Sequence, residues 1–116
     1  MKFHEALLKV IEGWNADPIE DEWLFESFRE KFIDGMSAAE AFEMIDPTLE
    51  VLLLQRDEST ATEVLQTVIG LARRSATTQV PDVLSIHRKT LEEQFRNFGD
   101  YAKGKLFELL RYYRLQ

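Results

Sequence analysis

The segment that most constrains the fold of this chain runs from Thr60 to Pro81 and has the sequence TATEVLQTVIGLARRSATTQVP. Apolar residues recur in it at steps of three and four, the spacing that gathers them on one face of an α-helix. Thr60 and Glu63 have capping-box spacing and predict where this helix begins, while Pro81 limits its end. We predict a central helix that other helices cover along Ala61, Val64, Leu65, Val68, Ile69, Leu71 and Ala72.

Gly70 interrupts that apolar face. Glycine inside a helix costs about 1 kcal/mol relative to alanine. Its presence indicates either that a neighbouring helix passes close to Gly70 or that the central helix tolerates a local defect.

Six further helices are predicted, beginning near residues 2, 17, 37, 46, 81 and 100. Asp17–Pro18 and Asp46–Pro47 each combine an N-cap residue with a proline in the first turn, which is typical of helix starts. Ser37 and Glu40 have the spacing of a second capping box, and Asp100 is placed to cap the last helix.

The fold class follows from these segments. Val51–Leu54 is apolar throughout and would suit a buried strand, but the Asp-Pro start and the lack of a partner strand favour a buried helix. A chain of 116 residues with 45% apolar residues is long enough to build one core. We predict an all-α fold forming a single helical domain over residues 1–116, either a compact bundle or a short stack of about seven helices.

The chain contains no cysteine, which excludes disulfides, thiolate metal sites and a cysteine nucleophile. Its first residues, MKFHEALLKVIEGW, mix charged and apolar side chains and are not expected to act as a signal peptide. No segment has the length of a membrane span. We expect a cytoplasmic protein without a membrane partner.

Charge is distributed unevenly about a cut between Glu63 and Val64. The first part has 16 acidic and 5 basic residues, a net charge of −11, whereas the second has 5 acidic and 9 basic residues, a net charge of +4. Either the two halves neutralise each other inside the monomer, or the acidic half attracts a basic protein partner. A duplex would be repelled by most of the molecule, so we predict no nucleic-acid partner.

Acidic residues recur every four positions from Glu22 to Asp34, on one side of the second predicted helix. Like charges at this spacing destabilise a helix by roughly a few tenths of a kcal/mol per pair. One interpretation is a solvated face relieved by Arg29 and Lys31. The other is a docking surface for basic side chains of a partner, with a tryptophan as apolar anchor. The predicted residues of this surface, called the acidic strip below, are Asp17, Glu20, Asp21, Glu22, Trp23, Glu26, Glu30 and Asp34.

No catalytic motif is present, so we predict neither an enzyme nor a cofactor or metal site. Glu40, Glu43 and Asp46 have helical spacing and, with Glu26 or Glu30, could hold Mg²⁺ as in helical nucleotide pyrophosphatases. A second acidic pair at matched spacing and a lysine for phosphate are both missing. This enzyme class is therefore a remote alternative.

Basic and tyrosine residues of the second half allow an RNA-binding interpretation. Their density is modest, and most of the tyrosines have core spacing, so pairing with the acidic half is the simpler role. His87 lies on the apolar seam of the sixth predicted helix and is predicted to be a partly buried core histidine. The basic residues are Arg88, Lys89, Arg96, Lys103, Lys105, Arg111 and Arg114.

The run ARRSATTQVP, a following helix and the terminal DYAKGKLFELLRYYRL together resemble the C-terminal part of small helical immunity proteins of bacterial polymorphic and contact-dependent toxin systems. The similarity lies in helix order, a Thr-Thr-x-x-Pro turn and a basic, tyrosine-rich terminus. It implies a protein without catalysis of its own that covers the active site of a cognate toxin domain. Many such toxins are nucleases with basic clefts, which an acidic strip would complement. The competing class is a general helical adaptor.

Overall fold

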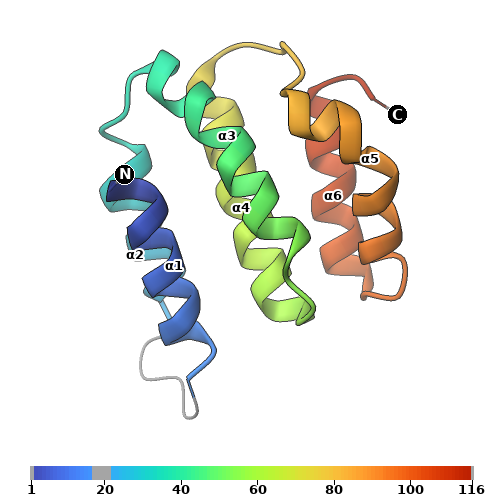
Figure 1. The fold of residues 1–116 in the computed structure, drawn as a ribbon, viewed down its shortest axis with the longest axis horizontal. Coiled ribbons are helices and arrows are strands. Elements are labelled where there is room, and N and C mark those ends of the chain that lie inside the picture. The colour runs from blue at the N-terminus through green and yellow to red at the C-terminus, as the bar shows by residue number, and fades with distance from the viewer. Residues whose placement is uncertain (1, 17–21, 116) are drawn as a thin grey trace.

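The computed structural model describes residues 2–16 and 22–115, and this part of the chain is helical without any strand. The all-α prediction is therefore confirmed, although the described residues form six helices instead of about seven (Figure 1). The helices are α1 Lys2–Trp14, α2 Leu24–Ile33, α3 Ala38–Leu53, α4 Glu58–Ser75, α5 Asp82–Phe95 and α6 Asp100–Tyr112.

The missing helix boundary is the one predicted at Pro47, which lies inside α3. Asp46 does not cap a new helix, because its Oδ1 accepts a hydrogen bond from the backbone N–H of Val83, 3.1 Å away. Proline removes one N–H from the helix, and the carbonyl that loses this donor belongs to Glu43, which is exposed to solvent. The missing hydrogen bond therefore lies on a solvent-exposed side of the helix.

The other predictions for α3 are mostly confirmed. Ser37 and Glu40 form the predicted capping box, with the Ser37 Oγ 3.1 Å from the Glu40 N. Val51 and Leu52 are buried in helix, as favoured over a strand. Leu54 ends the helix and is 78% exposed, so the segment is not buried throughout as predicted.

The second helix starts later than predicted. Glu22 and Trp23 lie in a turn, and α2 begins at Leu24 without a side-chain cap. The predicted N-cap and first-turn proline, Asp17 and Pro18, lie outside the described residues.

The N-cap residue of the central helix, α4, lies three residues before the predicted cap, Thr60. Asp57 caps it by accepting a hydrogen bond from the backbone N–H of Thr60 at 2.9 Å. Thr60 is buried, with its hydroxyl within hydrogen-bond distance of Asp57 Oδ2 and Asn15 Oδ1. The predicted capping box of Thr60 and Glu63 is therefore wrong, since a stronger acceptor precedes it in the sequence. All seven predicted core residues of this helix are buried.

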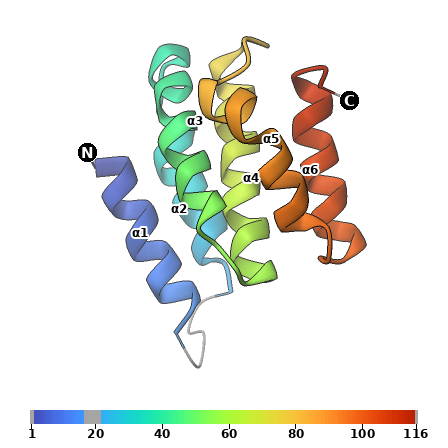
Figure 2. The same ribbon diagram turned by 45° about the vertical axis from the view of Figure 1, so that its right-hand side comes forward.

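The six helices form three helical hairpins stacked side by side. α1 packs on α2, α3 on α4 and α5 on α6; between hairpins, α3 contacts α1 and α5, and α4 contacts α2 and α6. Figures 1 and 2 show the two resulting layers, one of odd-numbered and one of even-numbered helices. The molecule measures 38 × 35 × 19 Å, and two layers about 8–10 Å apart account for the shortest dimension. The prediction of a compact all-α helical bundle is therefore confirmed, and its helices are arranged as stacked hairpins.

Helix α4 lies at the centre of this stack and is buried over most of its length. Its buried hydroxyls are all satisfied within their own helix or its cap: those of Thr62, Thr67 and Ser75 donate to backbone carbonyls of the preceding turn. A close neighbour explains Gly70, because a Cβ at this position would lie 3.3 Å from Ile33 Cδ1 of α2. The first of the two interpretations of Gly70 is the correct one.

The last hairpin departs from its predictions at two points. His87 is exposed, not partly buried, because the helix is interrupted there, with φ −108° and ψ 15°. Gly99, not Asp100, occupies the N-cap position of α6, and its N–H donates to Glu58 Oε2 of α4 at 3.2 Å.

The inward side chains of α6 and its C-cap residue are buried: Ala102, Leu106, Leu109, Leu110 and Tyr113. Burial raises the pKa of the Tyr113 phenol, with smaller effects from Tyr112 and Asp46. The unfolded state loses this proton at lower pH than the folded state. Tyr113 therefore lowers the stability of the fold as pH rises above about 10, the ordinary pKa of tyrosine.

Two helical glycines offer a matched test of the close approach of α2 to α4. Gly104 of α6 has no atom within 4 Å of an added Cβ. Gly104→Ala should raise the free energy of unfolding by about 1 kcal/mol, because alanine is the better helix former. Gly70→Ala should gain clearly less, since Ile33 must move. Urea denaturation of both variants measures this difference. Equal increases in the free energy of unfolding would show that Ile33 of α2 moves aside without measurable cost.

The cap of α4 can be tested in the same assay. Asp57→Ala should lower the free energy of unfolding by about 1–2 kcal/mol, because it leaves the Thr60 N–H without its acceptor. Asp100→Ala removes an acidic residue from the first turn of α6 without removing a cap, and we expect a loss of only a few tenths, roughly the dipole contribution. A similar loss in both variants would contradict the assignment of Asp57 as the N-cap.

Candidate protein-binding face

The described residues of the acidic strip lie on α2 and at its two ends, and three of them line a groove together with residues of α4. Glu26 and Glu30 belong to α2, Asp34 is its C-cap residue, and Glu22 lies in the preceding turn. All four are exposed, and none forms an ion pair with another described residue. Trp23, the predicted anchor, is 60% exposed. The remaining predicted residues, Asp17, Glu20 and Asp21, lie outside the described residues.

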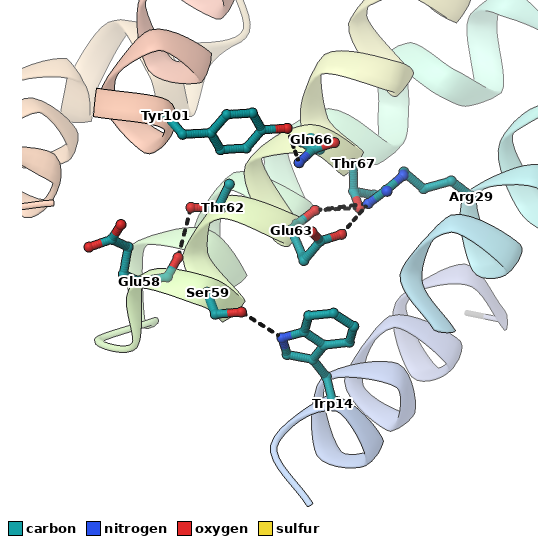
Figure 3. Close-up of polar contacts among 9 residues, drawn as sticks. All are labelled: Trp14, Arg29, Glu58, Ser59, Thr62, Glu63, Gln66, Thr67 and Tyr101. Atoms are coloured by element: carbon teal, nitrogen blue, oxygen red, sulfur yellow. Dashed lines mark hydrogen bonds and ion pairs between the residues drawn. The ribbon is translucent and has the colours of Figure 1, made fainter. Parts of the chain in front are cut away.

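The basic residues next to the strip do not pair with it. Arg29 points towards α4, where its Nη1 lies 3.1 Å from Glu63 Oε1 and 3.3 Å from the Glu63 carbonyl oxygen (Figure 3). The Lys31 ammonium lies 5.5 Å from the centre of the Phe32 ring. The interpretation in which Arg29 and Lys31 relieve the strip therefore has no ion pair to support it among the described residues.

A groove of about 460 Å³ separates the strip from α4. Ile33 and Gly70 lie along it, and Ile33 is only 5% exposed. Because Gly70 has no side chain, the groove stays open at this point. One wall carries Glu26, Glu30 and Asp34, and the other carries Arg73 and Arg74.

The two arginines on the α4 side are engaged elsewhere. Arg73 Nη2 lies 2.6 Å from Glu108 Oε2 of α6, and Arg74 Nε donates to the Met36 carbonyl at 2.6 Å. The acidic wall therefore faces positive charge across the groove without forming a direct ion pair. A basic side chain from another molecule would find these carboxylates accessible.

Polar side chains of α4 hold this face in place by reaching α1, α2 and α6. Figure 3 shows Ser59 accepting from Trp14 Nε1 of α1 at 3.1 Å and Gln66 Nε2 donating to the Tyr101 hydroxyl of α6 at 3.3 Å. Together with Glu63 and Arg73, they form an outward stripe along α4. Sequence reasoning missed these links because each joins residues far apart in the chain; only the helical spacing of the stripe could have indicated them.

The ion pairs also bear on the two interpretations of the uneven charge. Four ion pairs join described residues, and none connects the acidic part up to Glu63 with the basic part that follows it. The α1–α2 hairpin, which carries the strip, and the α5–α6 hairpin, which has six basic and five acidic residues over 82–112, lie on opposite sides of α3 and α4 (Figure 1). Direct pairing between the halves therefore does not account for the charge of the strip.

Two carboxylates of the pyrophosphatase alternative have structural roles. Glu40 belongs to a capping box and Asp46 accepts from the Val83 N–H. Within residues 2–16 and 22–115, no group of three or more histidine, aspartate or glutamate side chains is arranged to hold a metal ion. In the same part of the chain, no helix combines the length and apolar content needed to cross a bilayer.

Comparison with known proteins adds no relative. No family model, no curated protein and no solved structure matches this chain. The interpretation of this face therefore rests on its geometry, its charge and the sequence resemblance described above.

The contact of Arg29 with Glu63 should stabilise the face more than an ordinary surface ion pair, because its side chains are only 20% and 21% exposed. We expect a coupling energy of about 1 kcal/mol in a double-mutant cycle of Arg29→Met and Glu63→Gln. The matched pair is Arg88 with Glu92, at 35% and 46% exposure, with an expected coupling below about 0.5 kcal/mol. Urea denaturation of both cycles gives the comparison. Equal couplings would show that burial does not distinguish the two pairs.

Proposed function

We propose that this chain is an immunity protein that binds a cognate bacterial toxin domain, a nuclease, and occludes its active site through the acidic strip. The single observation that carries the proposal is the set of exposed carboxylates at Glu22, Glu26, Glu30 and Asp34, which have no ion-pair partner among the described residues. In this role the protein acts in the cytoplasm, by occlusion, without a cofactor or chemistry of its own.

Electrostatics explains why such a strip suits a nuclease. An enzyme that binds nucleic acid presents a basic cleft, and a negative surface on its inhibitor attracts the same groups. Complementary charge raises the association rate and disfavours wrong partners. The net charge of −7 keeps the inhibitor itself away from nucleic acid. The same negative charge thus attracts the inhibitor to the basic cleft and prevents the inhibitor from binding the nucleic-acid substrate.

The geometry of the face supports the same role. Arg29 of α2, the helix that carries the strip, binds Glu63 of α4. Beyond the C-terminal end of α2, the carbonyl of Met36 accepts a hydrogen bond from Arg74 of α4. A rigid surface loses little conformational entropy on binding. Trp23, at 60% exposure, adds the kind of aromatic residue that is enriched at interface hot spots.

The stacked hairpins also favour the alternative of a general helical adaptor, because such stacks present extended binding surfaces to many kinds of protein. The two functions differ in the partner that they require. An immunity protein binds and inhibits the toxin encoded beside it, whereas an adaptor has no such partner.

Charge reversal on the strip tests the proposed inhibitor. The variant Glu26→Lys, Glu30→Lys, Asp34→Lys should bind the toxin encoded by the adjacent gene roughly a hundredfold more weakly at moderate salt, taking about 1 kcal/mol per reversed charge. Its association rate should also lose most of its dependence on salt. Surface plasmon resonance measures both quantities, and a nuclease assay reports whether inhibition is lost with them.

The matched control reverses three exposed glutamates on the odd-numbered helices: Glu12→Lys, Glu50→Lys, Glu93→Lys. It changes the net charge by the same amount and should retain affinity within about threefold, since long-range steering alone is screened at this salt. If both triple variants bind as the unchanged protein does, the strip is not the binding surface. If the unchanged protein neither binds nor inhibits that toxin, the inhibitor function itself is wrong.

A further inference from the structure

A second groove lies on the opposite hairpin, between α5 and α6, and none of the functions considered above uses it. Its volume is about 350 Å³, within the range of pockets that hold small ligands or a few side chains. Phe95, Leu106 and Leu110 lie in it and are almost completely buried. Phe107 also lines the groove but is 53% exposed, so an aromatic ring stays accessible beside an apolar floor.

Positive charge borders this apolar groove. Arg96 of the α5 C-terminus and Lys103 of α6 line it, are exposed, and form no ion pair with any described residue. The acidic residue in the lining, Glu92, already accepts from Arg88 Nε at 2.9 Å. The net charge available to a ligand is therefore positive, in contrast to the acidic strip at the other end of the stack.

The position of these groups along α6 defines the shape of a ligand. Lys103 and Phe107 are one helical turn apart, and Leu110 follows at the next turn, so one charged side chain is followed by two apolar ones along one line. A segment lying along this line would place an apolar side chain next to Phe107 and a carboxylate next to Lys103 or Arg96. Lysine and arginine at such places select negative charge, while the apolar floor selects against a purely polar ligand.

We propose that the α5–α6 groove binds a short acidic protein segment with an aliphatic or aromatic anchor, whose carboxylates pair with Arg96 and Lys103. Charge complementarity favours such a segment over two larger anionic partners, nucleic acid and an anionic bilayer. Nucleic acid or an anionic bilayer would bring a long array of negative charge towards a molecule of net charge −7. A short segment would meet only the groove, whose lining presents Arg96 and Lys103 while Glu92 is paired with Arg88. This proposal is independent of the function of the acidic strip.

The test uses a synthetic ten-residue peptide in which glutamates flank two leucines and one phenylalanine, titrated into the ¹⁵N-labelled full chain. The amide resonances of Phe107, Leu110 and Lys103 should shift and saturate. The variant Arg96→Glu, Lys103→Glu should bind at least tenfold more weakly. The control variant Lys9→Glu, Lys89→Glu makes the same charge change at exposed positions outside the groove and should bind within about twofold of the unchanged protein.

A third variant separates the anchor from the charges. Phe107→Ser should weaken binding at least fivefold while circular dichroism and thermal unfolding stay nearly unchanged, because the ring is already more than half exposed. Equal binding by both charge variants, or equal binding of a peptide with lysines in place of the glutamates, would overturn the proposal. A response of the groove resonances to a single-stranded oligonucleotide or to phosphatidylserine vesicles, but not to the peptide, would also overturn it. So would a response to protein concentration alone, because that result would indicate that a second copy of the chain occupies the groove.

Discussion

The burial of α4 between α2, α3 and α6 is the interaction on which the rest of the structure depends. This helix supplies the middle of the core, and its neighbours on either side belong to different hairpins. Its buried hydroxyls are satisfied locally, so the apolar contacts are not offset by unpaired polar groups. A stack of hairpins is held together by contacts between neighbours, and α4 makes them in both directions.

The outward side of the same helix organises the candidate binding face. Glu63 binds Arg29 on one side, while Arg73 binds Glu108 on the other. These links use the charges nearest to α4 and leave those of Glu26 and Glu30 exposed. The acidic surface is therefore a consequence of how α4 engages its neighbours as well as of the composition of α2. At the α5–α6 groove the acidic lining residue Glu92 is paired with Arg88 within α5, and α4 takes no part in that contact.

The sequence predicted most helices and the core of α4 because helical periodicity is a local property. Its errors have a common origin in competition between local signals. Asp57, not Thr60, is the N-cap residue of α4. Pro47 is accommodated within α3 because the affected turn is exposed. His87 has the spacing of a core residue, but the irregular backbone at that residue leaves it exposed. In each case the hydrogen-bonding or solvent environment decided between two locally acceptable outcomes.

By itself, the sequence determined that this chain is helical, which faces of its helices are apolar, and that negative charge is concentrated in its first half. Each of these depends on residue type and on spacing within a few turns. Only the tertiary structure decided that the helices stack as hairpins, that Arg29 pairs with Glu63 and not with the strip, and that one groove lies between α2 and α4 and another between α5 and α6. These features depend on which distant segments meet, and that choice follows from packing the apolar faces together, which helical spacing does not specify.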